Sequence, residues 1–154
     1  MTIATRRATV ADMPDIVAML WRFFGRSNVR ALVEPDEQSC VTLMQAIIES
    51  DGELGVFQVA VDDCSIVGGA CFINGAFWFA PRAGWLTELF FYVQPEHRGG
   101  TGRMLKDAAE SDAKQCGFKG IVLHAGVGED GSGEAFKKYD YLAGDTMFLK
   151  QLVN

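Results

Sequence analysis

The sequence has little positive charge and no long apolar run. Lys and Arg number 14 against 20 Asp and Glu, which gives a formal net charge of -6 at pH 7. Because phosphate backbones and anionic membranes attract basic surfaces, this charge disfavours both as partners. No stretch approaches the ~18 apolar residues that cross a bilayer, and the first residues lack the apolar core of an export signal. We therefore expect a cytoplasmic protein that binds neither nucleic acid nor membrane.

Cysteine motifs are missing as well. The four cysteines, Cys40, Cys64, Cys71 and Cys116, are scattered, without a Cys-x-x-Cys pair or a neighbouring pair of histidines. We therefore expect reduced thiols, with neither a disulfide framework nor a metal site. The chain does have size and apolar content, with 154 residues of which 49% are hydrophobic. These values predict one compact domain over residues 1–154, and the apolar content is consistent with a homodimer.

Helical and strand patterns alternate along the chain. Apolar residues recur at helical spacing over 11–24, after a capping pattern of Thr9 and Asp12, and over 35–50, which starts with a proline. The other predicted elements are strands over 3–8, 55–63, 65–73, 85–93, 120–125 and 145–153, and helices over 101–116 and 134–139. The strands over 85–93 and 120–125 should be parallel neighbours joined by a right-handed crossover. The sequence thus predicts an α/β (α+β) fold: a mixed, mostly antiparallel sheet with helices on both faces and one parallel strand-helix-strand unit.

The most informative segment joins the strand over 85–93 to the helix over 101–116. It reads Gln-Pro-Glu-His-Arg-Gly-Gly-Thr-Gly-Arg over residues 94–103. Glycines let the backbone approach a ligand and leave the first N–H groups of the helix exposed. A helix N-terminus favours an anion and Arg98 or Arg103 adds charged donors, so the turn predicts a diphosphate site. The alternative is that the glycines only close a tight connection.

Two nucleotide-binding motifs are excluded. The chain has no Gly-Lys-Ser or Gly-Lys-Thr, which the phosphate-binding loop of nucleoside triphosphatases requires. The dinucleotide pattern Gly-x-Gly-x-x-Gly matches Gly100 and Gly102, but Leu105 occupies the third position and too few residues follow for that fold. The predicted diphosphate therefore belongs to another class of ligand.

The stretch YVQPEHRGGTGRMLKDAAESDAKQCG resembles the pyrophosphate-binding motif of the GNAT superfamily, the acetyl-coenzyme A dependent N-acetyltransferases. The predicted element order is also that of the family, and RRATVADMPDIVAML is similar to its first strand and helix. The resemblance implies the GNAT fold over nearly the whole chain and acetyl-CoA as cofactor. The turn is one residue shorter than the family pattern, so that either His97 or Arg98 occupies its Gln or Arg position, and we favour Arg98.

The resemblance also implies a set of cofactor-binding residues. The main-chain N–H groups around Tyr92 and Val93 are expected to stabilise the oxyanion of the reaction. The whole implied set is Tyr92, Val93, Arg98, Gly99, Gly100, Thr101, Gly102 and Arg103.

Acetyl transfer to an amine needs a base for the amine proton. Glu88 lies in the apolar strand over 85–93, where an unpaired carboxylate is costly to bury and where apolar surroundings raise a carboxyl pKa toward that of a base. The family often uses a Glu at this place, so Glu88 is the predicted base. The alternative is a charge on a strand face that reaches solvent or pairs with an arginine.

The predicted acid for the leaving thiolate is Tyr139. Many family members have a Tyr at the position where this chain, within AFKKYDY, has Phe136, and Tyr139 lies three residues on. Alternatively, Tyr139 is a packing aromatic and the thiolate leaves unaided. Tyr141 is expected to begin the last strand and to pack.

Several polar residues near these motifs are expected to have no special role. We interpret His97 as part of a solvated turn and His124 as an interior histidine. Asp62 and Asp63 are interpreted as a solvated turn between two strands.

The sequence therefore predicts an enzyme, an acyltransferase that moves an acetyl group from acetyl-CoA to a primary amine of a small molecule or peptide by direct attack. Two alternatives stay open. One is a catalytically weak acyl-CoA-binding or regulatory module of the same fold, which Phe136 at the usual Tyr position favours. The other is a protein-interaction domain that uses the aromatic stretch 77–85.

Overall fold

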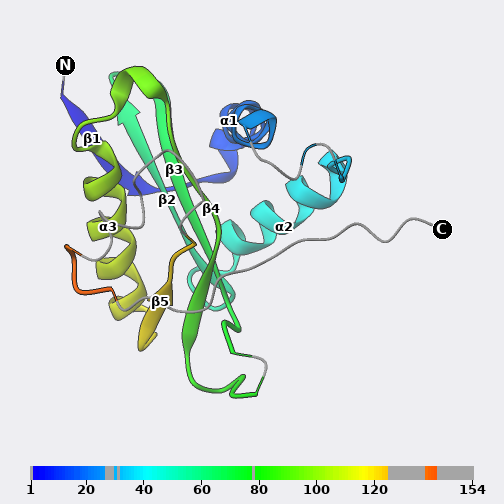
Figure 1. The fold of residues 1–154 in the computed structure, drawn as a ribbon, viewed down its shortest axis with the longest axis vertical. Helices are drawn as coiled ribbons and strands as arrows, with labels where there is room; N and C mark the ends of the chain where they lie inside the picture. Colours follow the sequence, from blue (N-terminus) through cyan, green and yellow to red (C-terminus); the bar gives the residue numbers. More distant parts are fainter. Residues whose placement is uncertain (1, 27–29, 31, 78, 125–137, 142–154) are drawn as a thin grey trace. The chain divides into compact units, whose positions relative to one another are not determined.

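The computed structural model describes residues 2–26, 30, 32–77, 79–124 and 138–141. The chain divides into two compact units, Met1–Val122 and Leu123–Asn154. The helices and strands of the described residues all belong to the first unit (Figure 1). They are β1 (Ile3–Arg7), the 3-10 helix η1 (Val10–Asp12), α1 (Met13–Arg26), α2 (Glu37–Glu49), β2 (Gly55–Asp62), β3 (Ser65–Asn74), β4 (Trp85–Val93), the 3-10 helix η3 (Pro95–His97), α3 (Thr101–Gln115) and β5 (Gly120–Val122).

A five-stranded sheet in the order β1-β2-β3-β4-β5 organises the first unit. Neighbours from β1 to β4 pair antiparallel, whereas β5 pairs parallel to β4 after the crossover through α3. Figure 1 shows α1 and α2 on one side of the sheet and α3 on the other. The predicted mixed, mostly antiparallel sheet with helices on both faces is confirmed, and so is the parallel β4-α3-β5 unit.

The larger core lies between the sheet and the two helices α1 and α2. Ile16 and Met19 of α1, Ile47 of α2 and Phe90 of β4 are almost fully buried in it. On the other face Leu105 of α3 is fully buried. Burial of each such side chain stabilises the fold by about 1.5–3 kcal/mol relative to its exposure. These two layers hold β4 firmly between the helices, which fixes the position of the turn that follows it.

Capping residues set the starts of η1 and α2. The Thr9 N–H donates to the Asp12 carboxylate over 2.8 Å, so the predicted capping pattern is present. The turn that it caps is the 3-10 helix η1, and α1 itself begins two residues later than predicted, at Met13. Asp36 caps α2 by accepting the Ser39 N–H over 3.1 Å. Helix α2 therefore begins after this cap and not at Pro35.

A β-bulge interrupts the pairing of β3 with β4. Phe90 lies opposite Cys71 and Glu88 lies opposite Phe72, which leaves Leu89 as an extra residue on β4. Such a bulge redirects side chains that would otherwise alternate between the two faces. Leu89 packs against the core under α1 and α2, and Phe90 is part of it. Glu88, which shares a face with Phe72, is directed toward the α3 side of the sheet.

Strand β5 is shorter than predicted. It ends at Val122, whereas the apolar pattern continues to residue 125. The predicted strand over 145–153 and most of the predicted helix over 134–139 lie outside the described residues.

Candidate functional site

The turn before α3 is open. Gly99 and Gly100 have φ angles of +100° and +148°, a region that residues with a side chain rarely adopt. A Cβ atom at either position would meet no heavy atom of the described residues within 4 Å, apart from those of its chain neighbours, so there is open space beside the turn. Helix α3 follows directly, with Gly100 as its N-cap residue. The turn therefore combines an approachable backbone with a helix N-terminus.

The first N–H groups of α3 have no acceptor within the helix. The Met104 N–H donates to the Gly100 carbonyl over 3.1 Å, and this is the first hydrogen bond of the helix. The N–H groups of Thr101 and Gly102 precede this bond, and helix geometry gives them no intrahelical partner. The Thr101 hydroxyl donates to the His97 carbonyl over 2.6 Å, which ties η3 to the helix. Donors of this kind lie beside the positive end of the helix, where an anion is favoured.

Two arginines flank the turn. The Arg98 Nε donates to the Val93 carbonyl over 3.4 Å and is thereby tethered to the end of β4. Arg103, on the first turn of α3, lies 3.6 Å from Asp107, and its side chain is 67% exposed. Both guanidinium groups face solvent at the positive end of the helix, where they add charged donors for phosphate oxygens. The donor set and the open space together fit a diphosphate.

His97 and Asp62 differ from their sequence interpretation. The His97 Nε2 lies 3.4 Å from the Asp62 Oδ2, and the two side chains are only 19% and 9% exposed. This pair connects the end of η3 to the end of β2, beside the open turn. Among the described residues, His97 Nδ1 and Asp62 Oδ1 are buried without a hydrogen-bond partner. The prediction of a solvated turn was wrong for both residues, while Asp63, with φ of +52°, does form the turn.

The described pairing of β4 with β5 is short. Their pairing within the described residues covers only Trp85 to Thr87 on β4, opposite Gly120 to Val122 on β5. Glu88 is the next residue of β4, and it is half-buried. The predicted base therefore lies where the edge of β4 loses its parallel neighbour.

A cavity lies on the face of β4 that packs against α1 and α2. It is an apolar cavity of about 230 Å³ between α1, α2 and β4, with Leu89 and Phe90 in its wall. Trp21 and Glu37 also line it, and the Trp21 Nε1 donates to the Glu37 carboxylate over 2.7 Å. The other described lining residues are apolar apart from Cys40, and none is basic. The bulge at Leu89 is what brings two consecutive β4 side chains to this face.

The comparisons with known proteins identify the family. A family model described as the Acetyltransferase (GNAT) family matches residues 13–141 of the chain. The chain belongs to the GNAT acetyltransferase family. Members of this family use acetyl-CoA, and membership makes the chain an acyltransferase. The family resemblance predicted from the glycine-rich turn is thereby confirmed.

Solved GNAT structures share the fold at low sequence identity. The N-acetyltransferase from Staphylococcus aureus Mu50 has a TM-score of 0.74 and 18% identity, over 91% of this chain and 83% of that one. AAC(6')-Iy, in complex with the bisubstrate analogue CoA-S-monomethyl-acetylneamine, has a TM-score of 0.72 and 9% identity, over 99% of this chain and 100% of that one. An aminoglycoside acetyltransferase from an uncultured soil metagenomic sample, in complex with sisomicin, has a TM-score of 0.70 and 16% identity, over 99% and 96% of the two chains. No curated protein matches the chain.

The remaining predicted residues of the GNAT site divide between the two units. Tyr92 is 7% exposed, its side chain lies in the core under α1, and Val93 is equally buried. In the second unit Tyr139 is 37% exposed, whereas Phe136 lies outside the described residues. His124 is exposed, so its interpretation as an interior histidine was wrong.

Sequence reasoning missed the cavity residues Trp21, Glu37 and Leu89. Neither a β-bulge nor the packing of two helices against each other leaves a pattern in the local sequence.

The described residues contain no group of three or more His, Cys, Asp and Glu side chains placed to hold a metal ion. All four cysteines are free. None of the helices in the described residues is long and apolar enough to cross a membrane.

Proposed function

We propose that the protein is an N-acetyltransferase that transfers the acetyl group of acetyl-CoA to a primary amine of a small molecule or peptide by direct attack. The open turn before α3 supports this most strongly. The N–H groups over 99–102, with Arg98 and Arg103, would hold the diphosphate of acetyl-CoA. The family assignment supports acetyl-CoA as the donor, as does the shared fold of AAC(6')-Iy bound to a CoA analogue.

Bound acetyl-CoA would supply a thioester whose carbonyl carbon an amine can attack. Glu88, where β4 leaves β5, accepts the proton that the amine loses as the C–N bond forms. Main-chain N–H groups around Tyr92 and Val93 donate to the negative charge that develops on the carbonyl oxygen. As the C–S bond breaks, Tyr139 gives its hydroxyl proton to the thiolate. The role of Tyr139 rests on its place in the sequence alone.

Calorimetric titration with acetyl-CoA, followed by a thiol-release assay over a broad panel of primary amines, tests this proposal. We expect saturable acetyl-CoA binding and thiol release that depends on the amine. Absence of binding at millimolar ligand would refute the proposed donor site. Binding without thiol release would instead favour the acyl-CoA-binding module.

The role of Glu88 has its own test. Glu88→Gln should lower kcat by about 10²-fold or more, because a positioned base contributes 10²–10⁴-fold, and should leave the acetyl-CoA Kd unchanged. Glu53→Gln, at an exposed glutamate beyond α2, is the matched control and should keep both values. An unchanged kcat for Glu88→Gln would remove Glu88 from the mechanism.

A further inference from the structure

Contacts at both ends hold the short helix η3 against the sheet. The Gln94 N–H donates to the Val67 carbonyl of β3 over 2.9 Å, and the Gln94 side-chain amide donates to the neighbouring Ile66 carbonyl over 3.2 Å. At the other end of η3, the His97 Nε2 lies 3.4 Å from the Asp62 Oδ2 at the end of β2. The segment that leads from β4 to the glycines is therefore attached to two further strands of the sheet.

His97 also contacts the first residue of α3. Its carbonyl accepts the Thr101 hydroxyl over 2.6 Å, and Thr101 is only 3% exposed. The Thr101 N–H is one of the first donors of the helix, for which helix geometry supplies no intrahelical acceptor. The contacts thus form a chain from Asp62 through His97 to Thr101. A displacement of His97 would move the backbone that the proposed diphosphate site uses.

The pair of His97 and Asp62 is costly for the fold. Among the described residues, each of the two side chains has a second polar atom, His97 Nδ1 or Asp62 Oδ1, that is buried without a hydrogen-bond partner. Such atoms lose their hydrogen bonds to water without replacement. Two apolar side chains of similar shape would avoid this loss, often at equal or higher stability. Stability alone therefore does not explain the pair, and its link to Thr101 indicates a role in ligand binding.

We propose that His97 and Asp62 are positioning residues for acetyl-CoA. They hold Thr101 and the preceding glycines in the arrangement that receives the diphosphate, so that the ligand has less of the turn to order when it binds. This inference rests on the proposed N-acetyltransferase function. Because neither residue takes part in the transfer step of that proposal, the pair should act on the affinity for acetyl-CoA and not on kcat.

Two acyl donors separate the positioning of the diphosphate from other effects. Acetyl-CoA carries the diphosphate, whereas S-acetylpantetheine has the same thioester without it. In His97→Leu and in Asp62→Leu we expect the KM for acetyl-CoA to rise about tenfold with kcat unchanged, since a hydrogen bond to a charged group is worth at least about that factor. The kcat/KM for S-acetylpantetheine should not change. An equal loss with both donors would overturn the proposal.

A conservative variant and a neighbouring residue provide the matched controls. His97→Gln keeps an N–H group that can reach Asp62, so its KM for acetyl-CoA should stay within about threefold of the unmodified protein. Asp63→Asn removes the adjacent, exposed carboxylate, and asparagine tolerates the φ of +52° at this position. It should leave KM unchanged. A rise in KM in His97→Gln as large as that in His97→Leu would contradict the role of the contact with Asp62.

A double variant separates the role in the site from a role in the fold. With both His97→Leu and Asp62→Leu, the free energy of unfolding should equal or exceed that of the unmodified protein, because no buried polar atom of the pair is left. The acetyl-CoA Kd should stay about tenfold higher, no more than in either single variant, because the two residues act through one contact. Recovery of the affinity together with the stability would show that the pair serves the fold alone.

Calorimetry distinguishes this inference from the proposed function. If acetyl-CoA binds to the unmodified protein and both single leucine variants bind it with unchanged Kd, the positioning proposal fails and the N-acetyltransferase proposal stands. If acetyl-CoA does not bind to the unmodified protein, the proposed function itself fails.

Discussion

Gly100 shows how single residues make the proposed diphosphate site. Its φ of +148° shapes the turn before α3, and apart from its chain neighbours no described residue has an atom within 4 Å of the place of a Cβ. The neighbouring Gly99 also has a positive φ. A side chain at these positions would both strain the backbone and occupy the space that a phosphate needs.

Gly100→Ala should weaken acetyl-CoA binding about tenfold or more and lower the free energy of unfolding by about 1–3 kcal/mol. Gly117→Ala is the matched control, because Gly117 follows the other end of α3, has φ of +86° and also has open space around it. It should lower stability by a similar amount without a change in affinity. Calorimetry and urea unfolding of both variants give the two quantities, and equal affinities would contradict the site.

The ion pair of Arg6 and Asp12 makes stability depend on pH. The hydrogen bond from the Arg6 guanidinium lowers the pKa of Asp12 from 3.8 to about 2. Because the folded pKa lies below the unfolded one, the contribution is complete above about pH 4 and is lost as the pH falls through about 2.

Asp12→Asn should therefore lower the free energy of unfolding by about 1–2 kcal/mol at pH 7, a value reduced by the 46% exposure of the Arg6 side chain. The difference from the unmodified protein should shrink as the pH falls below 4. Urea unfolding between pH 3 and 7 measures it, with Asp15→Asn at an exposed position as the control. A difference that stays constant with pH would contradict the assignment.

At the scale of elements, the bulge in β4 places Leu89 and Phe90 in the wall of the cavity. The sequence predicted the bounds of β4 correctly, since an apolar run between polar turns marks a strand well. The bulge was not predicted, because the register of β4 depends on its pairing with β3 and leaves no pattern within β4 itself. The alternation of side chains along β4 therefore could not tell which face Glu88 and Leu89 would take.

Deletion of Leu89 tests the role of the bulge. Without this residue, Phe90 and Glu88 would be consecutive opposite Cys71 and Phe72, which restores a regular ladder. We expect a folded protein with unchanged acetyl-CoA affinity and a kcat/KM for its amine acceptor lowered at least about tenfold. Circular dichroism and steady-state kinetics check the two parts. Undiminished kcat/KM would show that the bulge serves the fold alone.

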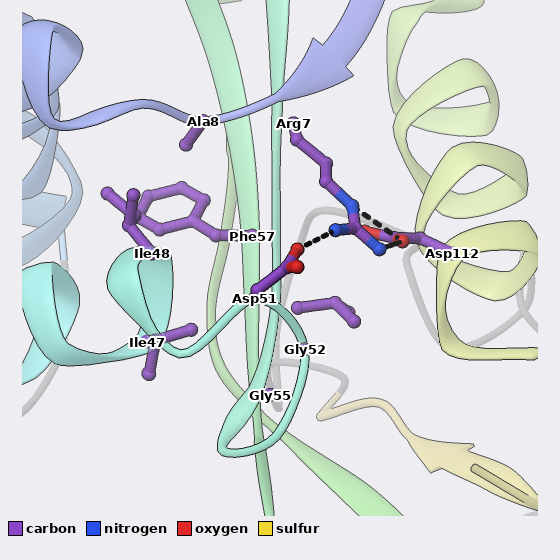
Figure 2. Close-up of a pocket in the computed structure, with 10 residues that line it drawn as sticks. Arg7, Ala8, Ile47, Ile48, Asp51, Gly52, Gly55, Phe57 and Asp112 are labelled. Atoms are coloured by element: carbon purple, nitrogen blue, oxygen red, sulfur yellow. Dashed lines mark hydrogen bonds and ion pairs between the residues drawn. The ribbon is translucent and has the colours of Figure 1, made fainter. Parts of the chain in front are cut away.

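At the scale of the whole first unit, a polar cluster joins both layers. Figure 2 shows the Arg7 guanidinium between Asp51, in the loop after α2, and Asp112 of α3. The Asp112 carboxylate also accepts a 2.7 Å hydrogen bond from Gln58, which is 4% exposed. One carboxylate thus links β1, β2 and α3, and its loss would leave a buried amide without a partner.

Asp112→Ala should lower the free energy of unfolding by about 2 kcal/mol, chiefly because the buried Gln58 loses its acceptor. Asp107→Ala, on the same helix at a side chain that is 54% exposed, should lower it by no more than about 0.5 kcal/mol, because its partner Lys106 keeps the ion pair with Glu110. Urea unfolding measures both values. Equal losses would show that the cluster contributes no more than a surface pair.

The sequence predicted the strands of the sheet and the glycine-rich turn, but not the contacts between residues far apart in the chain. The three glycines over 99–102 lie within four consecutive residues, so the sequence alone shows their motif. Contacts between residues far apart in the sequence, such as His97 with Asp62 and Trp21 with Glu37, form only when separate elements pack. The apolar spacing of α1 predicted a buried face, but not that part of this face would line a cavity.

Amide chemical shifts during titration with acetyl-CoA test the central claim most directly. If the turn before α3 holds the diphosphate, the N–H protons of Gly100, Thr101 and Gly102 should move downfield as they form hydrogen bonds to phosphate oxygens. The amide of Gly117, at the far end of the helix, should stay in place. Saturable binding that leaves the three amides unshifted would contradict the account.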